Sequence, residues 1–283
     1  MRIGFVGAGK VGVTLGKYMS ERNVCVSGFY SRSEASAKQA SLFTHTKYYR
    51  TLADIAESSD ALFLTVPDGA LEDVWNSLKQ YSLTGKFICH CSGAMSSAVF
   101  SEIDQMGAFG YSIHPLFAIH SRLQSYQEIS QAYFTIEGHP EYLYFWKKFF
   151  EDLGNPVRLI GGEQKVLYHS AAVFVSNLVT GLFEEGVDLL MHCGFDRKSA
   201  EGALAPLFVH NAQNVAQKGT AEALTGPVER GDAGTVSHHL EVLPEKEKEI
   251  YVRLSETLLE IATRKNPERD YRELSRMLER NGK

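Results

Sequence analysis

Up to about residue 160, the chain alternates short apolar runs with segments whose apolar residues recur at helical spacing. Amphipathic segments at Val11–Glu21, Ser33–Ser41 and Ala70–Tyr81 lie between apolar runs. Strands that alternate with helices are joined by crossovers, which predicts an α/β fold with a doubly wound, mostly parallel sheet. The predicted strands are Arg2–Val6, Val24–Tyr30, Ala61–Val66, Lys86–Cys91, Gly110–Ile113, Tyr133–Glu137 and Val157–Ile160.

The pattern changes after Gly161-Gly162. From Glu163 to Arg280 almost every segment has helical periodicity, and a Gly/Thr/Pro-containing loop at Gly219–Gly234 interrupts it. The sequence therefore predicts an α/β domain at residues 1–161 and an all-α domain at residues 162–283.

The first predicted strand runs into a glycine-rich turn, "GAGKVG", that fits the G-x-G-x-x-G pattern. In this pattern the first glycine permits a tight turn, the second lets the backbone approach a pyrophosphate, and the third packs the helix close to the strand. The helix N-terminus offers free N–H groups to the phosphates. The predicted phosphate-binding residues are Gly7, Ala8, Gly9, Lys10, Val11 and Gly12.

The end of the second strand indicates which dinucleotide binds. An NAD site places an acid about 20 residues after the glycines, where it bonds the ribose 2′-hydroxyl. This chain has Arg32 there, between Ser31 and Ser33. A guanidinium with two hydroxyls suits a 2′-phosphate, which a carboxylate would repel. Glu34 falls past the strand end, so the sequence favours NADP over NAD.

Polar residues also follow the next strands, at the sheet edge where open α/β folds bind ligands. Val66 and Pro67 follow the third strand and are predicted to contact the cofactor, although Pro67-Asp68-Gly69 also has ordinary turn chemistry. Ser92 is predicted to contact the cofactor or the substrate, and Gly93 and His114 to contact the substrate. Metal binding at "CHC", residues 89–91, is not expected, because strand alternation points the two cysteines away from the histidine.

The first segment of the helical half carries one polar stripe. At about 100° per residue, Lys165, His169 and Ser176 share a face of a helix that is otherwise apolar nearly all round. Such a helix is expected to be buried, with its polar groups satisfied. Internal hydrogen bonding is one interpretation. In the other, Lys165 or His169 protonates a substrate near a nicotinamide, and Ser176 and Asn177 contact or orient that substrate.

A second candidate lies in the loop "LTGPVERGD", residues 224–232. Loops held on a rigid scaffold often carry function. Arg230 could bind a substrate carboxylate through two hydrogen bonds, with Glu229 beside it. A solvated connection between helices with internal ion pairs is the alternative.

Composition excludes several classes of partner. The formal net charge is −5, which argues against a nucleic-acid or anionic-membrane surface, and four cysteines do not make a disulfide framework. The most apolar segment, Ala171–Phe183, is too short to span a bilayer. No signal peptide is expected before the first strand. These features predict a cytoplasmic protein with a small-molecule substrate.

With these residues in view, the chain resembles a family of NADP oxidoreductases in which a Rossmann-like domain precedes a helical domain of formerly unknown function. The resemblance rests on "GFVGAGKVG", "YSRS", "TVPD", "CSGA", "SIHPL", "YHSAAVFVSNLVT" and "LTGPVERGD". That family is related to pyrroline-5-carboxylate reductase, 6-phosphogluconate dehydrogenase and deazaflavin-dependent NADP reductases.

The resemblance implies an NADPH-dependent reductase of a small carbonyl or imine acid and a homodimer formed through the helical domain. Some members act as ketopantoate reductases in pantothenate synthesis, so 2-dehydropantoate is the substrate to consider first. Relatives carry a catalytic lysine with asparagine four residues later. Lys165 matches the lysine, whereas His169 replaces the asparagine. A non-catalytic NADP sensor or scaffold and a deazaflavin-linked reductase remain alternatives.

Overall fold

The computed structural model describes residues 1–282 and consists of two compact units. The first unit is Met1–Ser176 and the second begins at Asn177. The sequence prediction placed the boundary after residue 161. The segment that follows, including the first helix of the predicted helical domain, thus lies in the first unit.

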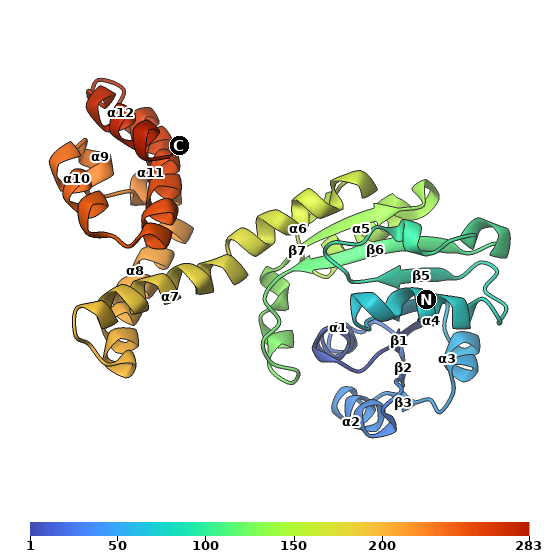
Figure 1. The fold of residues 1–283 in the computed structure, drawn as a ribbon. Coiled ribbons are helices and arrows are strands. Elements are labelled where there is room, and N and C mark those ends of the chain that lie inside the picture. The colour runs from blue at the N-terminus through green and yellow to red at the C-terminus, as the bar shows by residue number, and fades with distance from the viewer. Residues whose placement is uncertain (283) are drawn as a thin grey trace. The chain divides into compact units, whose positions relative to one another are not determined.

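The first unit is built on one eight-stranded sheet of order β3-β2-β1-β4-β5-β6-β7-β8 (Figure 1). All neighbours pair in parallel except β6 and β7, which are antiparallel. This confirms the predicted mostly parallel sheet. The strands are β1 Ile3–Val6, β2 Val26–Tyr30, β3 Lys47–Tyr48, β4 Ala61–Leu64, β5 Phe87–His90, β6 Phe109–Leu116, β7 Tyr133–Gly138 and β8 Val157–Leu159.

Helices cover both faces of this sheet because successive strand residues point to opposite sides. Phe5 packs into one core with residues of α1, α2 and α5, whereas its neighbour Val6 packs into another with residues of α3 and α4. Both cores are continuous and apolar, as a sheet buried on two faces requires. The helices are α1 Lys10–Ser20, α2 Glu34–Thr44, α3 Leu52–Ser58, α4 Leu71–Leu78 and α5 Leu143–Asp152.

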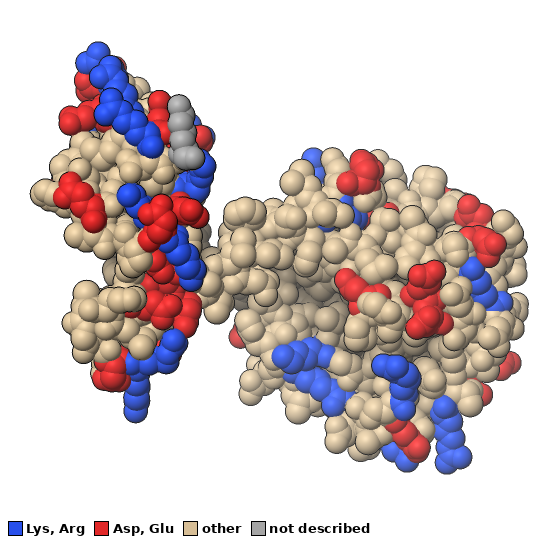
Figure 2. All heavy atoms as spheres, viewed as in Figure 1, with Lys and Arg blue, Asp and Glu red and all other residues tan. Residues whose placement is uncertain are grey.

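The single helix predicted to carry Lys165, His169 and Ser176 is interrupted. It divides into α6 (Lys165–Phe174) and α7 (Asn177–His192), separated by a turn at Val175 and Ser176. The expectation that it is buried was wrong for this chain. Leu167 is 77% exposed and Phe174 68% exposed, and Figure 2 shows the surface over most of α6 free of charged side chains.

The prediction that this region is too short to cross a bilayer also needs correction. The helical stretch Gly162–His192 is long and apolar enough to cross a membrane by length and composition, with a mean hydropathy of 1.5 in its most apolar window. The sequence prediction counted only the central apolar residues and not the helical turns on either side. None of that window is buried in the single chain.

The second unit is entirely helical where the structure describes it. After α7 come α8 Arg197–Ala223, α9 Pro227–Arg230, α10 Ala233–Val242, α11 Glu245–Lys265 and α12 Arg272–Asn281. Its core joins α9 to α12 through Val228, Val236, Val252 and Leu274. The predicted loop at Gly219–Gly234 therefore contains the short helix α9, which starts at Pro227 and is capped at its C-terminus by Gly231.

Candidate active site

The glycine turn after β1 gives each of its three glycines a different role. Gly7 has φ +114°, and a Cβ there would lie 2.5 Å from the backbone oxygen of Thr65. A Cβ on Gly12 would collide with the Thr65 hydroxyl, so this glycine lets α1 pack close to β4. A Cβ on Gly9 would meet no atom within 4 Å. The turn is thus closed toward the protein and open at the position where a pyrophosphate would approach.

The start of α1 adds free donors to this opening. Gly9 is the N-cap residue, and no side chain caps the first turn. Uncapped N–H groups at a helix N-terminus form an anion-binding site. Lys10, Val11 and Gly12 are the first helical residues, and their predicted contact with the phosphates stays a prediction. The local geometry fits the phosphates of a dinucleotide.

Beside the turn lies a cavity of about 350 Å³ bounded by the ends of β1, β2 and β4 and by α4. Asp73 of α4 is an acid that sequence reasoning did not include in this site. The predicted cofactor residues that line the cavity are Gly7, Ala8, Gly9, Ser31, Arg32, Val66 and Pro67. Ser33 is not among its lining residues, and its hydroxyl instead accepts the backbone N–H of Ser36 at the start of α2.

The side chain of Arg32 is available to bind a phosphate group. Its side chain lines the cavity, is exposed and makes no hydrogen bond or ion pair within residues 1–282. Glu34, the nearest acid in sequence, pairs with Lys38 at 2.6 Å one turn further along α2. The cation at the end of β2 is therefore not neutralised by a neighbouring carboxylate in the part of the chain that the structure describes.

The turn after β5 is held by the side chains of His90 and Ser92. The Ser92 N–H donates to His90 Nδ1 at 3.1 Å, and the Ser92 hydroxyl donates to Asp68 at 2.8 Å. The same hydroxyl oxygen accepts the N–H groups of Ala94 and Met95. Ser92 was predicted to contact the cofactor or substrate. In this structure its hydroxyl organises the turn.

Lys165 is the first residue of α6 and is 1% exposed. Its ammonium donates to the backbone oxygen of Ser92 at 2.7 Å and to the hydroxyl of Ser112 at 2.8 Å. Burial lowers the pKa of Lys165 to about 8, and the negative charges of Glu137 and Asp68 oppose this shift. The lysine thus ties α6 to the ends of β5 and β6.

His114, near the end of β6, faces the same helix. Its Nδ1 atom lies 2.8 Å from the hydroxyl of Tyr168 on α6. Burial lowers the pKa of His114 to about 3, and the nearby Lys165 and His169 reinforce the shift. Burial also raises the pKa of Tyr168. Both groups are therefore neutral around neutral pH.

His169 lies one turn after Lys165 and is half-buried. A Cβ on Gly93 would lie 2.6 Å from His169 Nδ1 and 3.0 Å from His114 Nε2, so the absence of a side chain lets both rings pack over this glycine. His169 Nδ1 is buried and has no hydrogen-bond partner within residues 1–282. The two imidazoles, predicted separately from the sequence, are thus brought together at Gly93.

Sequence reasoning missed three residues of this arrangement. Asp68 was interpreted as a possible turn residue, and Ser112 and Tyr168 were not considered. Ser112 lies two residues before His114 and so shares its face of β6, which is a usable signal. Tyr168 had none, because its partner lies 54 positions away in sequence.

The remaining candidates from the polar stripe lie at the turn between the two helices. Ser176 is exposed, and its hydroxyl donates to the backbone oxygen of Ala172 at 2.7 Å. Because α6 ends at Phe174, Ser176 does not continue the buried stripe that begins at Lys165. Asn177 begins α7 in the second unit. A substrate-orienting role for either residue stays a prediction.

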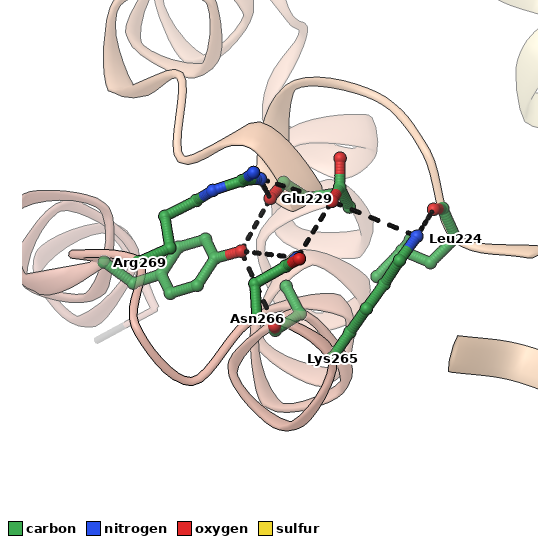
Figure 3. Close-up of polar contacts among 7 residues, drawn as sticks. Leu224, Glu229, Lys265, Asn266 and Arg269 are labelled. Carbon is green, nitrogen blue, oxygen red and sulfur yellow. Dashed lines mark hydrogen bonds and ion pairs between the residues drawn. The ribbon is translucent and has the colours of Figure 1, made fainter. Parts of the chain in front are cut away.

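In the second unit, Glu229 is the acceptor of a polar cluster (Figure 3). Its carboxylate accepts Asn266 Nδ2 at 2.9 Å and pairs with Arg269 at 3.2 Å and Lys265 at 3.9 Å. The tyrosine hydroxyl of Tyr271 donates to the Glu229 backbone oxygen at 2.6 Å. The cluster fixes α9 to the end of α11, which corresponds to the alternative interpretation of this loop as an ion-paired connection.

Arg230 differs from its neighbour. Its side chain is 59% exposed and has one distant ion pair, 3.9 Å from Asp232. Asp232 is itself occupied in capping α10 through Thr235. The Arg230 guanidinium therefore remains accessible to an anion, and its substrate-binding role stays a prediction.

Within residues 1–282 no group of three His, Cys, Asp or Glu side chains is arranged to hold a metal ion. In the "CHC" segment, His90 bonds the Ser92 turn, and burial raises the pKa of Cys91 to about 12. A protonated thiol is a poor metal ligand.

Comparison with known proteins identifies both parts of the chain. One family profile, described as a Rossmann-like domain, matches residues 1–115, and another, described as a domain of unknown function (DUF2520), matches residues 132–258. No curated protein matches the chain in sequence.

Several solved structures share the fold over nearly the whole chain. Protein TM1727 from Thermotoga maritima is 26% identical, with a TM-score of 0.74 over 93% of this chain and 99% of that one. Pyrroline carboxylate reductase from Plasmodium falciparum, solved with NADP bound, is 14% identical, with a TM-score of 0.60 over 100% and 98%. Imine reductase from Myxococcus stipitatus, solved with NADP+, is 14% identical, with a TM-score of 0.60 over 93% and 93%.

These matches confirm the resemblance seen in the sequence. The DUF2520 match begins before β7, so it includes the last two strands of the sheet as well as helices of both units. Residues 1–115 thus match a Rossmann-like domain, and residues 132–258 match DUF2520.

Proposed function

We propose that this protein is an NADPH-dependent oxidoreductase that reduces a small carbonyl or imine acid. The observation that carries the proposal is the cavity beside the glycine turn, which combines an open Gly9, uncapped helix N–H groups and the unpaired guanidinium of Arg32. Phosphates and a 2′-phosphate match these groups. Similarity of fold to reductases solved with NADP supports the same cofactor.

When bound, NADPH supplies a hydride. The residues of the chain must then hold the acceptor group and deliver a proton to its oxygen or nitrogen. Of the two candidate donors, the geometry favours His169. The Lys165 ammonium is buried from solvent and already donates hydrogen bonds to Ser92 and Ser112. His169 is half-buried and makes no hydrogen bond within residues 1–282. Lys165 instead supports the turn on which the two imidazoles pack.

The proposal is tested by incubating the purified full chain with NADPH and a panel of 2-keto acids and cyclic imine acids. Pantoate formation is the finer possibility, so 2-dehydropantoate is tested first. Consumption of NADPH with at least one compound is expected, and His169→Gln should lower turnover by about 100-fold or more, the usual contribution of a general acid. Tight NADPH binding without turnover of any compound would instead indicate a sensor or scaffold.

We further propose that two copies associate through the helical unit. Leu178, Leu182 and Leu207 on α7 and α8 are 50%, 47% and 68% exposed, and an apolar cavity of about 350 Å³ lies between the two helices. Apolar surface of this kind is normally covered by another protein surface.

Sedimentation velocity tests the association. The wild-type chain should sediment as a dimer and Leu207→Glu as a monomer. Leu123→Glu, at a comparably exposed leucine of the first unit, serves as the matched control and should leave the dimer intact. Recovery of the full chain in a membrane fraction would contradict both the dimer surface and the expected cytoplasmic location.

A further inference from the structure

Tyr168 and His114 form a hydrogen-bonded pair to which the proposed function has so far assigned no role. Tyr168 lies on α6, three residues after the buried Lys165, and His114 lies on β6 opposite Thr135 of β7. The Tyr168 oxygen and His114 Nδ1 are 2.8 Å apart, and the two rings meet edge to face with centroids 5.6 Å apart. This is the distance of a well-formed hydrogen bond.

The direction of this bond follows from the available partners. The other polar side chain that acts on the Tyr168 hydroxyl is that of Thr135, which lowers the pKa of the phenol, as a donor to its oxygen does. The proton of the Tyr168 hydroxyl is then available to His114 Nδ1. A phenol is also a much stronger hydrogen-bond acid than a neutral imidazole N–H. The O–H group therefore donates to Nδ1. In a neutral imidazole whose Nδ1 accepts, the hydrogen must be on Nε2.

The Nε2 atom faces the space next to His169 and Gly93. It makes no hydrogen bond within residues 1–282 and is not enclosed by the protein. Burial of the ring and the positive charge of Lys165 keep His114 neutral, since both lower its pKa. His114 is thus an uncharged donor whose N–H has no partner in the described chain.

We propose that Tyr168 is a positioning residue that fixes His114 in the Nε2–H form, so that His114 donates a hydrogen bond to the carbonyl oxygen or imine nitrogen of the substrate. The proposal rests on the proposed function, because it concerns the group that accepts the hydride. His114 was already predicted to contact the substrate, and the structure adds the contact of Tyr168 on α6 with its ring.

The chemistry explains why a neutral donor suits this position. As hydride from NADPH adds to carbon, the π electron pair moves to oxygen or nitrogen, and His169 supplies the proton that completes the reduction. A fixed donor stabilises the charge that develops on the heteroatom. A neutral imidazole can do so without adding a second cation beside Lys165, whereas an imidazolium would be repelled by it.

The first experiment reads the tautomer directly and needs no substrate. Long-range ¹H–¹⁵N NMR spectra of the full chain, assigned by the peaks that His114→Ala removes, should show Nε2 protonated and Nδ1 unprotonated. Tyr168→Phe should shift the Nδ1 resonance, because its hydrogen bond is lost. A wild-type spectrum with the proton on Nδ1, or an Nδ1 resonance that Tyr168→Phe leaves in place, would overturn the proposal.

The second experiment is a double-mutant cycle in kcat at saturating NADPH and substrate. His114→Ala should lower kcat roughly 100-fold, the scale of one lost transition-state donor, and Tyr168→Phe about tenfold. In the His114→Ala background, Tyr168→Phe should have no further effect, because it acts only through His114. An equal loss in both backgrounds would assign Tyr168 a merely structural role and reject the inference.

Controls separate this inference from the proposed function. Tyr144→Phe, at a tyrosine of α5 that is 75% exposed, should leave both the spectrum and kcat unchanged. NADPH affinity should be the same in all variants, and a selective loss of NADPH binding in Tyr168→Phe would refute a substrate role for His114. If the wild type reduces no keto or imine acid, the proposed function fails while the NMR result still decides the tautomer.

Discussion

Replacing Lys165 by methionine tests how much the burial of its ammonium group costs the fold. Methionine keeps most of the length of the lysine chain and removes the charge. In the wild type the ammonium is 1% exposed and has two hydrogen-bond acceptors, Ser92 and Ser112. The loss of hydration lowers the pKa of Lys165 from 10.5 to about 8, so it destabilises the charged form by more than the surrounding groups stabilise it.

The sign of the effect follows from proton binding. Between about pH 8 and 10.5 the unfolded chain holds a proton on Lys165 that the folded chain has released, so the free energy of unfolding rises with pH in this window. Below about pH 8 the full cost of the buried charge is present. At about 1.4 kcal/mol per pKa unit, the wild type should gain about 2.5 kcal/mol relative to Lys165→Met between pH 7 and pH 10.

The assay is urea unfolding of both proteins at a series of pH values, followed by tryptophan fluorescence. Both tryptophans of the chain, Trp75 and Trp146, are fully buried in the first unit and report on the unit that contains Lys165. Other groups that titrate in this range cancel in the difference between wild type and variant.

Lys148→Met is the matched control. Lys148 is exposed on α5 and pairs with Asp152 at 2.9 Å, and this partner raises its pKa. A group whose pKa is raised by folding stabilises the folded state by a constant amount at any pH below its unfolded pKa. The free energy of unfolding of the wild type relative to Lys148→Met should therefore not rise between pH 7 and pH 10. If the difference between wild type and Lys165→Met is flat or falls over the same range, the ammonium is not desolvated as described.

Three further predictions concern the two units. Arg32→Ala should weaken NADPH binding by about 1–3 kcal/mol and NADH binding little, measured by titration calorimetry, and equal losses would remove the 2′-phosphate assignment. Gly93→Ala places a methyl group 2.6 Å from His169 Nδ1 and must displace the ring, so turnover should fall at unchanged NADPH affinity; undiminished turnover would speak against the paired imidazoles. Glu229→Ala should destabilise the helical unit by about 1–2 kcal/mol in a thermal melt followed by circular dichroism, because Asn266 loses its acceptor; an unshifted melt would show that the cluster is dispensable.

Local sequence pattern determined the α/β unit almost completely. Alternating strands and helices, the glycine turn and the arginine at the end of β2 are encoded by neighbouring residues, so periodicity and spacing reveal them. Among the elements that the prediction did not name, β3 has two residues and α3 seven, too few for a pattern to repeat. The same locality placed Lys165 and His169 on one face of a helix.

Tertiary structure decided what those side chains do. Lys165 bonds Ser92, 73 positions away, and Tyr168 bonds His114, 54 positions away. Contacts at such separations depend on how β5, β6 and α6 meet, and helical periodicity carries no information about partners on other elements. The end of α6 at Phe174, and hence the separation of Ser176 from the buried lysine, was equally unreadable, because the apolar pattern continues through the turn. Sequence therefore determined which groups are available for chemistry. Packing determined that Lys165 is buried, that His114 is hydrogen-bonded to Tyr168, and that His169 has no hydrogen-bond partner within residues 1–282.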